Sequence, residues 1–179
     1  MVTEKELYIV LTDTGTLFTR LIKQVTGAPL NHASLALDPR LNEVYSFGRK
    51  NVRNPFFGGF VRENIRHPFF RQAECAIYKC TVSTDAYLRI ARRINEMRRS
   101  PERYKYHLLG LFGVLFDKPI ESKDAYFCSQ FVASVFEQAG FPLVGKPACL
   151  VTPEDLSKSP YLQLVYRGNM HDFSEQHAG

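Results

Sequence analysis

Two residues of this chain, Cys128 and His32, could act together as a nucleophile and its base. Cys128 lies near the start of the segment DAYFCSQFVASVFEQAG, in which apolar residues recur at helical spacing. The positive end of a helix dipole lowers the pKa of a thiol and so favours the reactive thiolate. His32 opens the segment NHASLALD, and imidazole is the usual base because its unperturbed pKa is ~6.5. Both residues also have structural interpretations, Cys128 as a small buried hydrophobe and His32 as a turn residue.

The elements that must position these residues are predicted from periodicity and from end signals. The Cys128 helix is predicted to start after an N-cap at Asp124 and to stop at Gly140. Ser83 is predicted to cap a second, strongly amphipathic helix. The turn DPRLN predicts a hairpin between the strands on either side of it. The predicted strands cover 6–13, 31–38, 43–49, 73–82 and 161–167, and further helices are predicted over 14–29 and 106–116.

The stretch from 48 to 72 has no clean period and is strongly basic. It contains a single acid, Glu63, against several Arg and Lys residues. Long irregular loops in compact domains are often functional, so Arg49, Arg53 and Arg62 are candidate substrate-binding residues that would favour a negatively charged substrate. The alternative is a surface segment whose phenylalanines pack into the core. The same mixture of Arg and aromatic residues can bind single-stranded nucleic acid, but no nucleic-acid motif accompanies it, and we expect no such partner.

Size and composition predict one globular domain. The 179 residues are 45% hydrophobic, and the formal net charge is +5. We see no signal peptide and no membrane-spanning segment, so we expect a cytoplasmic protein without stable membrane insertion. The four cysteines are expected to be free thiols. Their spacing matches no metal site, and we expect neither a metal nor another cofactor. The oligomeric state is left open.

The order of the motifs resembles a known family. NHASLALD followed by NEVYSFG, and much later by FCSQFVASVFEQAG and LVTPEDL, is similar to the circularly permuted branch of the papain-like NlpC superfamily. That branch includes relatives of lecithin retinol acyltransferase. The resemblance covers about Leu7 to Leu156. It implies an α+β fold in which a small antiparallel sheet, closed in part into a barrel, packs against helices.

The resemblance also implies roles for individual residues. Cys128 matches the nucleophile and His32 the general base. The third polar residue, which orients the imidazole, aligns with Ser46, although the family more often has His, Glu, Asn or Gln there. Glu43 is charged and close in sequence, but strand alternation places it on the opposite face from Ser46, so the third role stays open.

Two further substrate-binding candidates lie near the cysteine motif. Thr152 belongs to the segment VTPEDL, which resembles a loop at the border of the cleft, and Tyr126 precedes the cysteine by two residues.

Three functions follow as hypotheses. The first is a cysteine peptidase or amidase that cleaves an amide bond in a peptide or peptidoglycan-like fragment through a Cys-His dyad or triad. The second is an acyltransferase or lipid thioesterase with the same chemistry. The third is a binding module with weakened catalysis, which the uncharged Ser46 would favour. The catalytic domain is predicted to span 1–167, and 168–179 is predicted to be a polar, loosely held tail.

Overall fold

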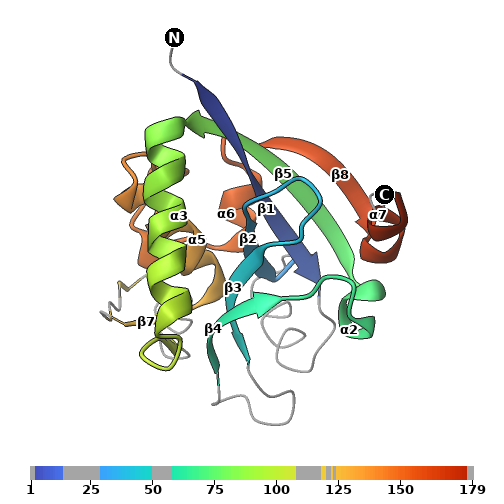
Figure 1. Ribbon diagram of the computed structural model, residues 1–179, viewed down its shortest axis with the longest axis horizontal. Coiled ribbons are helices and arrows are strands. Elements are labelled where there is room, and N and C mark those ends of the chain that lie inside the picture. Colours follow the sequence, from blue (N-terminus) through green and yellow to red (C-terminus); the bar gives the residue numbers. More distant parts are fainter. Residues whose placement is uncertain are drawn as a thin grey trace.

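The protein is built on one open, mostly antiparallel sheet. The computed structural model describes residues 3–13, 29–49, 58–107, 118–119, 122 and 124–176 (Figure 1). Its eight strands lie in the order β7-β6-β4-β3-β2-β1-β5-β8. The strands are β1 (Glu4–Asp13), β2 (His32–Ala36), β3 (Val44–Arg49), β4 (Gly58–Glu63), β5 (Glu74–Ser83), β6 (Lys105–Tyr106), β7 (Ala125–Tyr126) and β8 (Gln163–Asn169). Among the described strand pairs, only the short β6–β7 pair is parallel.

The helices lie against the sheet and its edges. They are α2 (Pro68–Arg71), α3 (Thr84–Arg99), α5 (Cys128–Gln138), the 3₁₀ turn η1 (Ala148–Leu150), α6 (Pro153–Ser157) and α7 (Met170–Gln176). Figure 1 shows α3 and α5 together on one side of the molecule, while α7 lies beside β8 and close to α2 on the other. The described strands and helices confirm an α+β fold.

Alternation along the central strands divides the apolar residues between two cores. On β1, Leu7, Ile9 and Leu11 face the main core, which also receives the apolar sides of α3 and α5. Tyr8 and Val10 point the opposite way into a smaller core. Cys75 and Cys80 of β5 likewise lie in different cores, so their predicted placement on opposite faces is confirmed.

The predicted hairpin and the predicted amphipathic helix are both confirmed. β2 and β3 pair Leu35 with Tyr45 and Ala36 with Val44. The Asp38 carboxylate accepts bonds from the backbone N–H of Asn42 and Glu43, which closes the turn. The Ser83 hydroxyl accepts from Ala86 N and caps α3.

The Cys128 helix is confirmed as an element, but it begins later than predicted. Its N-cap is Phe127 and Cys128 is its first residue, whereas Asp124 lies just before the short strand β7. Gly140, at φ +80°, terminates the helix region as predicted, because this left-handed conformation favours glycine. Cys128 therefore lies at the very start of the helix and not a turn inside it.

Three other expectations differ from the structure. The sheet is not closed, even in part, since β7 and β8 form two separate edges of the described sheet. The basic stretch is not irregular throughout, because Gly58–Glu63 forms β4 and Pro68–Arg71 forms α2. The described part of the tail, 168–176, is not loose, because β8 continues to Asn169 and α7 follows with Met170 and Phe173 buried. The helices predicted over 14–29 and 106–116 fall largely outside the described residues.

Candidate active site

The thiol of Cys128 lies where β2 and β3 separate. The two strands pair only at the far end of β2, so the residues near His32 have no β3 partner. Cys128 Sγ lies 4.0 Å from the carbonyl oxygen of Asn31 and accepts a hydrogen bond from the backbone N–H of Ala33. The first helical residue of α5 is thus inserted at the open end of a strand pair, and only 6% of Cys128 is exposed.

His32 contacts both Cys128 and an acidic residue. Its Nε2 lies 2.7 Å from Oε1 of Glu63, and its ring also makes a hydrogen bond with the Cys128 side chain. The His32 side chain is 14% exposed and that of Glu63 9%. Cys128, His32 and Glu63 therefore form a chain of three interacting groups that comes from α5, β2 and β4.

The surroundings favour the charged forms of all three groups. Burial acts to raise the pKa of the Cys128 thiol, but the hydrogen bond and charge of His32, with the N–H groups of Ala33 and Ser129, bring it below its ordinary value. Burial acts to lower the pKa of His32, yet the Glu63 carboxylate and Cys128 raise it to about 10. The geometry thus favours a thiolate–imidazolium pair.

Glu63 accepts hydrogen bonds from three side chains. The Ser34 hydroxyl donates to Oε2 at 2.5 Å, and the Ser46 hydroxyl donates to Oε1 at 2.6 Å, beside His32. Both distances are typical of O–H donors on an ionised carboxylate. Burial acts to raise the pKa of Glu63, but the charge of His32 and these three bonds lower it overall.

The third residue predicted from the sequence is therefore placed differently. Ser46 bonds to Glu63, and Glu63, not Ser46, bonds to the His32 ring. Glu43 lies on the other face, within 3.5 Å of the Tyr45 hydroxyl, as strand alternation predicted. The signal that could have identified Glu63 was its position as the single acid in a basic stretch.

The predicted substrate-binding side chains that the structure describes make their contacts away from this cluster. Arg53 lies outside the described residues, as does the Arg49 side chain. Arg62 alternates with Glu63 along β4, so it points to the opposite face, where its Nη2 donates to the carbonyl oxygen of Asn42 at 3.0 Å.

Tyr126 and Thr152 have structural contacts. The Tyr126 ring is buried 5.0 Å from the Phe47 ring, centroid to centroid. The Thr152 hydroxyl caps α6, since it accepts from Asp155 N and donates to the Asp155 carboxylate at 2.6 Å. Thr152 nevertheless follows a residue that contacts the cysteine turn, because the Ser129 hydroxyl donates to the Val151 carbonyl at 2.7 Å.

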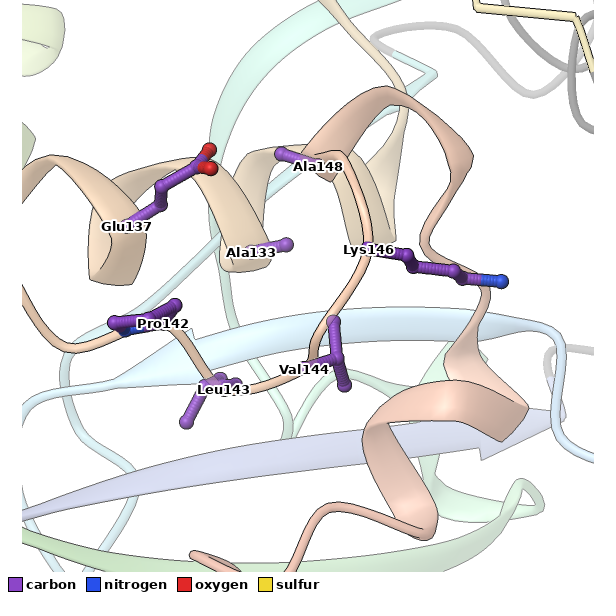
Figure 2. A pocket seen from close by; sticks show the side chains of 7 residues that line it. All are labelled: Ala133, Glu137, Pro142, Leu143, Val144, Lys146 and Ala148. Carbon is purple, nitrogen blue, oxygen red and sulfur yellow. The ribbon is translucent and has the colours of Figure 1, made fainter.

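The hollow shown in Figure 2 is separate from this cluster. It lies between the later part of α5 and the segment after it, and its volume of about 10 Å³ matches roughly one water molecule. Its lining residues are Ala133, Glu137, Pro142, Leu143, Val144, Lys146 and Ala148. It is too small for a substrate.

Within the described part of the chain, no group of three or more His, Cys, Asp or Glu residues is arranged to hold a metal ion. In the same residues, no helix has the length and apolar character needed to cross a membrane.

Comparison with other proteins adds no assignment. No protein-family model and no curated protein matches this chain.

Proposed function

We propose that this protein is a cysteine-dependent acyl-transfer enzyme, and specifically a hydrolase of amide bonds. The observation that carries the proposal is the Cys128–His32–Glu63 chain, in which a thiol at a helix start meets an imidazole that is itself held by a buried carboxylate. A nucleophile, its base and a third group that orients the base are the parts needed for nucleophilic catalysis.

The reaction follows from the charges of these groups. The Cys128 thiolate attacks the carbonyl carbon, and the carbonyl oxygen becomes an oxyanion. His32 donates its proton to the leaving amine as the carbon–nitrogen bond breaks, which leaves a thioester on Cys128 and a neutral imidazole. Water then attacks the thioester. His32 takes the proton of the water, the carbon–sulfur bond breaks, and the thiolate–imidazolium pair returns with the release of a carboxylic acid.

The start of α5 offers a donor for the oxyanion. The first backbone N–H groups of a helix have no partner within the helix, and Cys128 is the first residue of α5. Its own N–H lies next to the attacking sulfur in the covalent structure, so it is the natural first donor of an oxyanion hole.

The choice of an amide, in a peptide or a peptidoglycan-like fragment, rests on the resemblance to the permuted papain-like NlpC superfamily. The hypothesis of weakened catalysis rested on an uncharged third residue at Ser46. A carboxylate beside His32 removes that argument, since a charged partner stabilises the imidazolium.

The test is to trap the acyl-enzyme. We expect intact-mass measurement of the protein, incubated with a panel of short peptides, muropeptides and thioesters, to show an acyl adduct that peptide mapping assigns to Cys128. The Cys128→Ala variant should form none, and Cys149→Ala is the matched control because Cys149 is also buried. Product with a free carboxylate indicates hydrolysis, whereas transfer to an added amine or alcohol identifies an acyltransferase. A panel that reacts equally in the Cys128→Ala variant would refute the proposal.

A further inference from the structure

The Glu63 carboxylate is held by an arrangement that a simple Cys-His-Glu triad does not require. Ser34 and His32 lie two residues apart on β2, so they face the same side, and Ser46 reaches the same carboxylate from β3. Glu63 itself comes from β4, where it pairs with Val44. Its side chain therefore crosses β3 to reach β2, and a serine from each of these strands meets it.

The two hydroxyls bind different oxygens of the carboxylate. Ser34 donates to Oε2, whereas Ser46 and His32 share Oε1. Donors on both oxygens fix the plane of the carboxylate as well as its position. Gly48 lies close to the Ser46 hydroxyl and the His32 ring, since a Cβ there would lie 3.6 Å from Ser46 Oγ and 3.9 Å from His32 Cε1. The His32 ring and the Ser46 hydroxyl therefore both lie within 4 Å of the position that a Cβ of Gly48 would take.

These hydroxyls also bear on where the proton resides. In a buried site, a carboxylate and an imidazolium can become neutral by passing the proton from His32 to Glu63, because burial penalises both charges. An ionised carboxylate accepts hydrogen bonds only, so each O–H donor stabilises it relative to the neutral acid. The serines therefore oppose the transfer of the proton to Glu63.

We propose that Ser34 and Ser46 are positioning residues that keep Glu63 ionised and correctly oriented, and that through Glu63 they hold His32 as the imidazolium partner of Cys128. This inference rests on the proposed function, in which the thiolate–imidazolium pair performs the chemistry. Among the described residues, the charged groups that act on His32 are Glu63 from β4 and Cys128 from α5, and His32 is the charged group that acts on Cys128.

The test uses the pH dependence of Cys128 alkylation. If Ser34 and Ser46 only filled space, replacing them would not shift this dependence along the pH axis. Iodoacetamide labelling of Cys128 would be followed by peptide mapping from pH 5 to pH 10 for the natural protein, Ser34→Ala, Ser46→Ala, the double variant and Ser46→Thr. We expect the acid limb of the labelling profile of the double variant to shift to higher pH by about one unit, which is about a tenfold loss of rate on that limb, and the rate to approach the natural one at pH 9. Ser46→Thr, which retains a hydroxyl, should restore most of the rate.

The matched control is Ser159→Ala. Ser159 is also buried and makes an equally short bond, from its hydroxyl to the Leu143 carbonyl at 2.6 Å, but it lies in another part of the chain. The buried Cys75 and Cys80 report folding in the same experiment, since they should stay unlabelled in every folded variant.

Two further variants separate the possible failures. If Glu63→Gln slows labelling at pH 6 but the double serine variant behaves like Ser159→Ala, the serines only fill space and the inference is wrong. If Glu63→Gln has no effect while His32→Ala does, the inference fails but the Cys-His chemistry remains. If neither variant changes the pH profile, the proposed function itself fails.

Discussion

Cys128 differs from the cysteines of β5 in the direction in which its surroundings move the thiol pKa. Burial raises the pKa of Cys75 to about 12, with help from the charge of Glu74, and raises that of Cys80 to about 11. Cys128 is also buried, but the hydrogen bond and charge of His32 reverse the effect of burial on its pKa. Among these three thiols, the surroundings favour the thiolate only at Cys128, and His32 is the largest influence in that direction.

This contrast predicts selective labelling. At pH 6, iodoacetamide should modify Cys128 well before Cys75 or Cys80, because only the thiolate reacts and its pKa is lowered only at Cys128 among these three. His32→Ala should shift the labelling profile of Cys128 to higher pH, as the imidazolium that stabilises the thiolate is gone. Peptide mass mapping measures both results. Equal labelling of the three cysteines in the folded protein would contradict the prediction.

The sequence predicted two members of the observed cluster and misplaced the third. Cys128 and His32 could be identified because each lies near the predicted start of a regular element, although the exact start of the Cys128 helix was predicted too early. Ser46 was selected by position on the strand after the histidine strand, and it does reach the cluster, but only through Glu63. Which strand lies beside β3 is a matter of long-range pairing, and no local pattern around Glu63 records it.

At the scale of elements, β4 is the strand that the sequence did not reveal. Its segment GGFVRE begins with two glycines, which are poor strand formers, and has too few residues for alternation to be clear. The strand forms because it pairs with β3 along its whole length, from Val44–Glu63 to Arg49–Gly58. Because the sequence did not predict β4, it did not place Glu63, at the end of β4, beside His32.

Gly58 shows why the first residue of β4 must be small. A Cβ at Gly58 would lie 2.7 Å from the Gly48 carbonyl oxygen and 2.8 Å from Tyr106 Cβ, both too close. Gly58→Ala should force β4 away from β3 or β6 and cost about 1–3 kcal/mol of unfolding free energy, the usual range for overpacking. Urea unfolding measures this cost. Gly145→Ala is the control, because a Cβ there meets nothing within 4 Å, and a similar loss in both variants would count against the argument.

For the whole molecule, the C-terminal segment closes the smaller core. Phe173 of α7 is 4% exposed and its ring lies 5.2 Å from the ring of Tyr166, centroid to centroid. The polar composition of the segment predicted a loose tail, because two buried residues in a short helix leave no visible period. Met170 and Phe173 are buried because α7 packs into the smaller core of the sheet, and such long-range packing cannot be predicted from the local sequence.

Phe173→Ala should therefore destabilise the whole domain by about 3–5 kcal/mol, as for other buried phenylalanines. Phe69→Ala is the matched control, since Phe69 is 39% exposed and should lose much less. Thermal unfolding of the two variants beside the natural protein gives the comparison. A Phe173→Ala variant as stable as Phe69→Ala would show that α7 does not contribute to the core.

The site also predicts how the stability of the molecule changes with pH. A raised pKa at His32 stabilises the fold fully below the ordinary value of 6.5, and this stabilisation is lost as the pH rises towards about 10. The lowered pKa of Cys128 stabilises the fold above the ordinary thiol value of 9.0, and this is lost as the pH falls. Between 6.5 and 9.0 the two trends act in opposite directions and offset each other, because folding to the ion pair moves a proton from the thiol to the imidazole.

Cys128→Ser should remove that offset. The serine hydroxyl does not ionise, so only the His32 trend remains, and the unfolding free energy should fall as the pH rises above 6.5, by up to ~1.4 kcal/mol per pH unit. Urea unfolding at several pH values, expressed as the difference between the variant and the natural protein, isolates this slope. Cys149→Ser is the control for loss of a buried sulfur, and parallel curves for the two variants would contradict the ion pair.

The resting position of one proton has a consequence for isotope effects. In the proposed thiolate–imidazolium pair, His32 carries the proton and Cys128 is a thiolate, so forming a bond to sulfur requires no proton to move. Alkylation of Cys128 should therefore proceed at nearly the same rate in heavy water as in ordinary water across the plateau of its pH profile. Breakdown of an acyl-enzyme by water should be slower in heavy water, because His32 must then remove a proton from the attacking molecule. Alkylation of Cys128 and breakdown of the acyl-enzyme would thus respond differently to the same change of solvent.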